Sequence, residues 1–142
     1  MPTRVLFVCV HNSARSQMAE GMLRAWGAPA WEAASAGLEA TFVRLEAIAA
    51  MEEIGIDISD QQSKTLDAFK GSTWDLAITL CDEAAEACPM VPGAARLLHW
   101  SLEDPSPAKG TDEQRLDVYR RVRDDLGGRI RELIGVGAPA IA

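Results

Sequence analysis

Apolar runs of strand length alternate along the chain with longer segments that carry helix signals. The apolar runs predict four strands, at residues 5–8, 31–36, 74–80 and 94–100. The remaining segments predict three helices, at about 16–26, 41–54 and 112–134. Strands that are apolar throughout and separated by helices are typical of a parallel sheet covered on both faces. We therefore expect the α/β class, a three-layer sandwich with a central four-stranded parallel sheet flanked by helices.

The predicted helices differ in how clearly the sequence marks them. Thr41 is the expected N-cap of the second helix, and Gly55 is its expected stop. The last helix has one apolar stripe, made of Leu116, Tyr119, Val122, Leu126, Ile130 and Leu133. The pair Gly127-Gly128 interrupts this helix and weakens the prediction for its second half. Residues 135–142 are expected to be a loose tail.

Length, charge and cysteine content narrow the class of protein. A chain of 142 residues is expected to form one domain, over 1–142, with a sizeable core. The net charge of −7 argues against nucleic acid or an anionic membrane surface as a partner. The opening apolar run is too short for a signal peptide or a membrane span. Three cysteines fit no secreted disulfide framework, so we expect a cytoplasmic protein. We also expect a monomer.

The segment from Cys9 to Arg15 joins a strand-end cysteine to a turn that leads into a helix. The segment encloses Val10, His11, Asn12, Ser13 and Ala14, and Ser16 follows it. Backbone N–H groups of such a turn converge on an anion, and the helix dipole adds positive potential. Arg15 adds two parallel N–H donors, and the same field favours the thiolate form of Cys9. We interpret Cys9 as the nucleophile of an oxyanion site, against the alternative that it only fills space at a strand end.

Three candidate residues follow three of the predicted strands. Cys9 ends the first strand, Cys81 directly follows the third, and Asp104 lies just past the fourth. Ligands of open parallel sheets bind at the carboxyl ends of the strands. We therefore expect all three residues at the same rim of the sheet.

Cys81 and Cys88 form the second candidate chemical unit, in the segment CDEAAEACP. A fully helical segment would place the two cysteines about 10 Å apart along the axis. A disulfide needs Cα atoms roughly 4.4–6.8 Å apart, so a bond between them requires unwinding. This predicts a redox-driven switch. The alternative is that Cys81 fills a gap at the strand end and Cys88 packs on the core.

Asp104 precedes Pro105, and Asp-Pro by itself is an ordinary turn. Beside a thiolate and an anion, its carboxylic acid would also protonate an oxygen leaving group. Glu103 is a weaker candidate for that role. His11 and His99 receive no catalytic role, since a lone histidine on a strand or loop is usually structural.

The loop CVHNSARS, the run ITLCDEAAEACP and the motif WSLEDP together resemble the thioredoxin-coupled arsenate reductases of the low-molecular-weight protein tyrosine phosphatase fold. The resemblance spans nearly the whole chain. The phosphatases of this fold share the loop and the Asp-Pro pair. Cys81 and Cys88, seven residues apart, distinguish the reductases.

The resemblance implies a mechanism for these positions. Cys9 attacks arsenate held by the loop amides and Arg15, and Asp104 protonates the departing hydroxide. Cys81 then attacks Cys9 and releases arsenite, and Cys88 attacks Cys81 to give a Cys81–Cys88 disulfide that thioredoxin reduces. Asn12 and Ser16 would orient the loop and support the Cys9 thiolate. No cofactor is implied, and a glutaredoxin-type protein or a small thiol is an open alternative as reductant.

Some members of this group bind potassium behind the loop, and Asn12, Glu20 and Ser35 fall at matching places. Where those members offer further oxygen ligands, this chain has Gln62 and Lys64. An ammonium from Lys64 would occupy the region and repel a cation, so we predict no bound potassium. The alternative for Lys64 is a solvated surface side chain. The spacing of Cys81, Cys88 and His99 also fits no zinc pattern.

Two other functions stay open from the sequence. One is a phosphatase that hydrolyses phosphate monoesters through a Cys9 phosphocysteine, with Arg15 and Asp104 in the same roles; weak activity of this kind would also fit a reductase. The other is a redox or arsenical sensor that binds a partner through its switching helix. Loss of Cys81 and Cys88 would abolish reductase turnover and spare ester hydrolysis, whereas a sensor would form its disulfide without turnover.

Overall fold

Four parallel strands form a single sheet in the computed structural model, which describes residues 2–82, 91 and 93–135. The strand order is β2-β1-β3-β4, and the central pair is β1 and β3. The strands are β1 (Thr3–Cys9), β2 (Trp31–Gly37), β3 (Trp74–Thr79) and β4 (Ala94–His99). The α/β fold with a central four-stranded parallel sheet flanked by helices is confirmed. Cys88 and the predicted tail from 136 onward lie outside the described residues.

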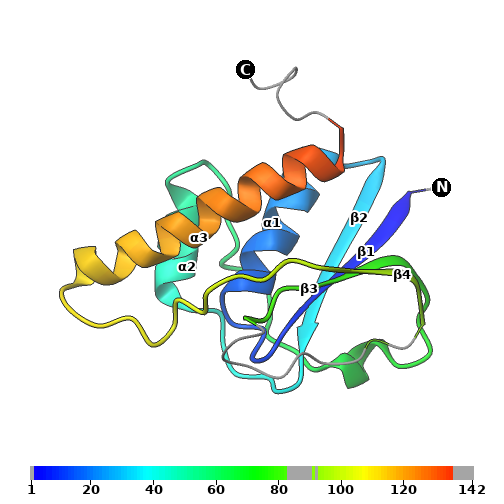
Figure 1. Cartoon of the computed structure of the whole chain (residues 1–142), viewed down its shortest axis with the longest axis horizontal. Helices are drawn as coiled ribbons and strands as arrows, with labels where there is room; N and C mark the ends of the chain where they lie inside the picture. Colours follow the sequence, from blue (N-terminus) through cyan, green and yellow to red (C-terminus); the bar gives the residue numbers. More distant parts are fainter. Residues whose placement is uncertain (1, 83–90, 92, 136–142) are drawn as a thin grey trace.

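Different elements pack on the two faces of the sheet, and successive side chains of a strand point to opposite faces. Val5 and Phe7 of β1 face the core that contains the three α-helices. These helices are α1 (Arg15–Gly27), α2 (Leu45–Glu52) and α3 (Asp112–Leu133). Leu6 and Val8 face the other side, where Leu66 and Phe69 of the short 3-10 helix η1 (Leu66–Phe69) pack. Figure 1 shows α1, α2 and α3 gathered on one side of the strands and η1 on the other.

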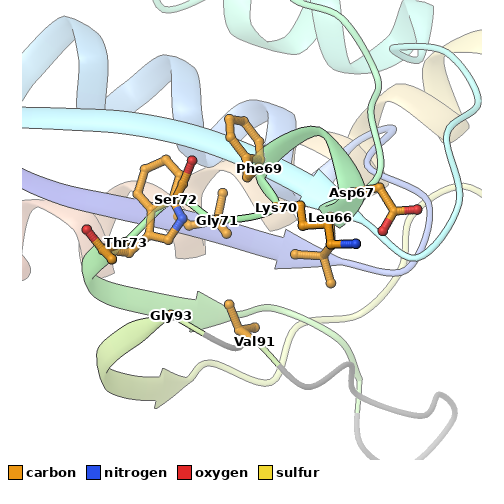
Figure 2. Close-up of a pocket in the computed structure, with 11 residues that line it drawn as sticks. Leu66, Asp67, Phe69, Lys70, Gly71, Ser72, Thr73, Val91 and Gly93 are labelled. Carbon is orange, nitrogen blue, oxygen red and sulfur yellow. The ribbon is translucent and has the colours of Figure 1, made fainter.

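A cavity of about 540 Å³ lies on the η1 side of the sheet, near the start of β3. Its lining includes Leu66, Phe69, Trp74 and Val91 (Figure 2). The lining contains no residue of the segment from Cys9 to Arg15. That segment follows the carboxyl end of β1, whereas the cavity adjoins the amino end of β3. Because the strands are parallel, the segment and the cavity lie at opposite ends of the strands.

The prediction of a helix over 41–54 with Thr41 as N-cap was wrong at its start. The helix α2 begins at Leu45, and Arg44 occupies the cap position in an extended conformation. The backbone N–H of Thr41 instead binds Ser63 Oγ, and that of Arg44 binds the carbonyl of Ser13. Because these hydrogen bonds tie residues 41–44 to other segments, the helix begins only at Leu45.

The last helix is continuous through Gly127-Gly128, which confirms the prediction of a helix over 112–134. It runs from Asp112 to Leu133 and begins with a capping box. Thr111 Oγ1 accepts from the Gln114 backbone N–H, and Gln114 Oε1 accepts from that of Thr111. Gly127 is buried, and a Cβ at this position would lie 3.5 Å from the Trp26 ring. This is an ordinary van der Waals distance, so Gly127 lies in the packed contact of α3 with α1 without interrupting the helix.

The fourth strand is less buried than its apolar sequence predicted. Leu97 of β4 is 59% exposed, and its neighbours Ala95 and Arg96 are exposed as well. The reason is its place at the edge of the sheet, beside β3 only. In the described part of the chain, no helix combines the length and the apolar character needed to cross a membrane.

Candidate active site

The segment between β1 and α1 forms a buried loop whose carbonyl groups point away from its centre. The Val10 carbonyl accepts from the backbone N–H groups of Leu38 and Glu39, and the Ser13 carbonyl accepts from that of Arg44. Within the described residues, the N–H groups from His11 to Ala14 donate no hydrogen bond to the protein. Buried N–H groups require an acceptor, and successive ones in a turn at a helix start suit an anion.

Gly37, the last residue of β2, lets the sheet approach this loop closely. A Cβ on Gly37 would lie 2.7 Å from the Val10 carbonyl oxygen and 2.8 Å from the Asn12 nitrogen. Both are backbone atoms, which cannot move aside without changing the loop. Gly37 also donates its N–H to the Lys64 carbonyl at 2.9 Å, which ties a third segment to the site.

Asn12 holds the loop in shape from inside the protein. Its backbone is left-handed, with φ of 49°, a conformation that asparagine tolerates better than most residues. The backbone N–H of Lys64 donates to Asn12 Oδ1 at 2.8 Å. Because a backbone N–H only donates, this contact fixes the orientation of the amide. The Asn12 Nδ2 group therefore donates to Ser16 Oγ at 2.8 Å and to Ser35 Oγ at 2.9 Å.

Cys9 is a free thiol, 2% exposed, at the end of β1. Its Sγ lies 2.8 Å from Ser16 Oγ. Since Ser16 Oγ already accepts from Asn12, its single proton is available for Cys9 Sγ. A donated hydrogen bond stabilises a thiolate, so the expected support of Cys9 by Asn12 and Ser16 has a geometric basis.

The hydrogen-bond chain behind the loop ends at a buried carboxylate. Ser35 Oγ donates to Glu20 Oε1 at 2.5 Å, so Asn12, Ser35 and Glu20 are brought together as the sequence suggested. The Lys64 ammonium lies 3.9 Å from Glu20, and Arg24 pairs with the other carboxylate oxygen. The predicted position of the Lys64 charge is confirmed. Gln62 contributes its carbonyl oxygen, which accepts from Lys64 Nζ at 3.0 Å.

The guanidinium of Arg15, which follows the loop after β1, contacts the segments that follow β3 and β4. It is 2% exposed, and its Nη1 donates to the carbonyls of Leu80, just after β3, and Leu102, just after β4. Its Nη2 lies 3.8 Å from Asp104 Oδ2. Arg15 thus lies between Asp104 and the residue before Cys81, which supports the expected convergence of Cys9, Cys81 and Asp104 at one rim of the sheet.

Asp104 takes part in a turn and also faces the site. Its Oδ1 accepts from the Ser106 backbone N–H at 2.9 Å, which is the ordinary turn contact of an aspartate. Its Oδ2 faces Arg15, and its side chain is 24% exposed. A carboxyl group anchored by one oxygen, with the other beside the oxyanion loop, is placed to deliver a proton.

Cys81 directly follows Leu80 and is buried. It is disulfide-bonded, whereas Cys9 is free, so the structure holds Cys81 in its oxidised form. Of the two histidines, His11 Nδ1 lies 3.5 Å from Glu39, and His99 Nδ1 lies 2.7 Å from Thr79 Oγ1. Within the described residues, no group of three His, Cys, Asp or Glu side chains is arranged to hold a metal ion.

Sequence reasoning missed two residues that hold the site together. Gln17 is fully buried, and its Nε2 reaches the backbone carbonyl and side-chain oxygen of Asn12. Arg24 pairs with Glu20 across one helical turn, a spacing of four residues that the sequence does display. For Gln17 the sequence holds no comparable signal, because its other partners, Gln61 and Gln62, lie more than 40 residues away.

Several known proteins are similar to this chain in sequence and fold. Residues 4–138 match the family described as low molecular weight phosphotyrosine protein phosphatase. An arsenate reductase of Halalkalibacterium halodurans is 46% identical over 133 residues, which are 94% of this chain and 96% of that protein. A structure titled as an arsenate reductase in the phosphate binding state has a TM-score of 0.79 and 41% identity, covering 94% of this chain and 97% of that one.

A third similar protein is the thioredoxin-dependent arsenate reductase of Corynebacterium glutamicum. It has a TM-score of 0.68 and 31% identity, and the match covers 95% of this chain and 63% of that one. The resemblance to arsenate reductases of this fold, drawn from sequence motifs, is confirmed by these relatives. The chain belongs to the low molecular weight phosphotyrosine protein phosphatase family.

Proposed function

We propose that this protein is an arsenate reductase that uses Cys9, Cys81 and Cys88 in turn and is regenerated by thioredoxin. The observation that carries the proposal is the pairing of a free Cys9 thiol in the oxyanion loop with a disulfide-bonded Cys81 after β3. The arsenate reductase of Halalkalibacterium halodurans, 46% identical to this chain, supports the same assignment.

The first step is attack of the Cys9 thiolate on arsenic(V). The N–H groups from His11 to Ala14 and the Arg15 guanidinium hold the oxygens of arsenate. Asp104 donates a proton to the departing oxygen, which leaves as water, and a sulfur–arsenic bond forms. Ser16 holds the Cys9 sulfur in place for this attack through the 2.8 Å contact.

The second step reduces the arsenic. The Cys81 thiolate attacks Cys9 Sγ, the sulfur–arsenic bond breaks, and its electron pair stays on arsenic, which leaves as arsenite. Two thiols become one disulfide while arsenic(V) becomes arsenic(III), so two electrons balance. Cys88 then attacks Cys81, which frees Cys9 and leaves a Cys81–Cys88 disulfide. A free Cys9 beside an oxidised Cys81 matches the end of this sequence.

Thioredoxin is the proposed electron donor because a similar structure carries that dependence in its name. Its dithiol would reduce the disulfide by thiol–disulfide exchange. A phosphatase with the same loop needs Cys9, Arg15 and Asp104 only. The oxidised Cys81 has no part in ester hydrolysis, and for this reason the reductase is the better assignment.

The test measures two activities on the same set of variants. Arsenate-dependent turnover with thioredoxin, thioredoxin reductase and NADPH is expected for the wild type and to be lost in Cys9→Ser, Cys81→Ser and Cys88→Ser. Hydrolysis of a phenyl phosphate, if present, is expected to be lost only in Cys9→Ser. Ester hydrolysis without any arsenate-dependent turnover in the wild type would contradict the proposal.

A further inference from the structure

A second arginine lies beside the oxyanion loop and has no role in the steps above. Arg44 donates its backbone N–H to the Ser13 carbonyl at 2.9 Å, so its Cα is fixed next to the loop. Its side chain is half-buried, and the guanidinium lies over the Phe42 ring, 5.1 Å from the ring centroid. The contact with an aromatic face holds the guanidinium in one place at the protein surface.

The charge of Arg44 is not neutralised by the protein. Its Nε is buried without a hydrogen-bond partner, and its guanidinium forms no ion pair with any described residue. The nearby carboxylates are engaged elsewhere, since Glu46 lies 3.6 Å from Arg115 and Asp104 faces Arg15. A buried N–H donor without an acceptor costs free energy, so the arrangement suits an anion from solution.

Tyr119 of α3 lies within electrostatic range of both Arg44 and Asp104. Burial, with a contribution from Glu46, raises the pKa of the Tyr119 hydroxyl to about 12. Arg44 opposes this effect and Asp104 adds to it, so both charges lie near the same hydroxyl. Asp104 in turn faces Arg15 at the loop. The placement of Arg44 beside the loop rests on its own backbone hydrogen bond to Ser13.

We propose that Arg44 is a second cationic contact for the tetrahedral oxyanion, recruiting it to the mouth of the Cys9–Arg15 loop. The proposal rests on the oxyanion chemistry of the proposed function. The whole protein carries a net charge of −7 and repels a dianion at long range. A local cation at the entrance offsets this repulsion, whereas Arg15 is buried at the base of the loop.

The experiment measures oxyanion binding without requiring reduction. Fully reduced protein is alkylated with iodoacetamide in increasing inorganic phosphate, and modification of Cys9 is followed by mass spectrometry. For Arg44→Gln, the phosphate concentration that gives half-protection should rise about 3- to 30-fold, as for loss of one charge-assisted hydrogen bond at a half-buried site. Arg44→Lys, which keeps the charge, should show a smaller rise. Arg96→Gln on the exposed edge strand is the matched control and should match the wild type.

The proposal would be overturned if Arg44→Gln and the wild type needed the same phosphate concentration for half-protection of Cys9. It would also be overturned if Arg44→Lys raised this concentration as much as Arg44→Gln does. If Arg44→Gln does not fold, Phe42→Leu tests the same contact by removing the ring beneath the guanidinium, and unchanged protection there is the contrary result. In turnover, Arg44→Gln should raise KM for arsenate and leave kcat unchanged. If the wild-type protein kept three free thiols after incubation with arsenate, the proposed reductase activity would be refuted. Protection of Cys9 by phosphate would still test the role of Arg44, because it does not depend on reduction.

Discussion

Ser16 Oγ lies 2.8 Å from Cys9 Sγ and accepts a hydrogen bond from Asn12, which leaves its own proton available to the sulfur. The contact is buried, and it joins the nucleophile to a chain of hydrogen bonds that ends at Glu20. The hydroxyl thus supports the reactive form of the thiol.

Removal of this hydroxyl should slow the chemistry of Cys9 without unfolding the protein. In Ser16→Ala, the rate of Cys9 alkylation at neutral pH should fall about 10- to 100-fold, the usual effect of one hydrogen bond to a charged group. The rate of arsenate-driven disulfide formation should fall in parallel. Ser72→Ala, near the cavity on the other edge of the sheet, is the control. If Cys9 of Ser16→Ala were alkylated at the same rate as Cys9 of the wild type, the contact would have no chemical role.

Two glycine variants should have opposite effects. Gly37→Ala places a Cβ against backbone atoms of the loop, at 2.7 and 2.8 Å, and should reduce both activity and thermal stability. Gly128→Ala on α3 meets nothing within 4 Å and should stabilise the protein by about 0.5–1 kcal/mol, because alanine favours a helix. Thermal unfolding and arsenate turnover measure both effects. Full activity in Gly37→Ala would mean that the loop tolerates displacement.

The charge of Lys64 should make the enzyme indifferent to potassium. Its ammonium lies 3.9 Å from Glu20, where a bound cation would otherwise be attracted. We expect the same kcat/KM for arsenate in sodium and in potassium salts at equal ionic strength. Lys64→Ala should create a response to potassium, whereas Lys70→Ala at the exposed end of η1 should not. A clear rise of wild-type kcat/KM on adding potassium would contradict the prediction.

An acid-sensitive ion cluster should link α2 to α3. Hydrogen bonds from Arg120 and then Arg123 lower the pKa of Glu53 from 4.5 to about 2. A lowered folded-state pKa adds stability above the unfolded value of 4.5, and this stability is lost as the pH falls to about 2. Glu53→Gln should lower the unfolding temperature at pH 7, and the difference from wild type should disappear near pH 2. Glu52→Gln, at the neighbouring exposed carboxylate, should behave like the wild type at both pH values.

The order of elements and the chemical role of the loop were predictable from local patterns. The strand before Cys9 and the helix after Arg15 follow from apolar runs and spacing within short windows of sequence. The rule that parallel strands end at one rim predicted that Asp104 lies at the same rim as Cys9, and the contact of Asp104 with Arg15 of the loop agrees with that prediction.

The errors came from contacts between distant segments. Thr41 looked like a helix cap, yet Ser63 and the loop carbonyls bind residues 41–44 and keep them extended. Gly127 weakened the prediction for the second half of α3, yet the helix continues through it in contact with α1. The contacts of Gln17 with Gln61 and Gln62 likewise join distant segments, and no local pattern predicts that the Arg44 side chain is left without an ion pair in the described part of the chain.

The most direct test incubates the fully reduced protein with arsenate, without any reductant, and maps its thiols by mass spectrometry. The reductase account predicts one free thiol at Cys9, a disulfide between Cys81 and Cys88, and a Cys88→Ser variant that stops as a Cys9–Cys81 disulfide. Three free thiols after long exposure, in a protein that still hydrolyses a phenyl phosphate, would contradict it and show a phosphatase.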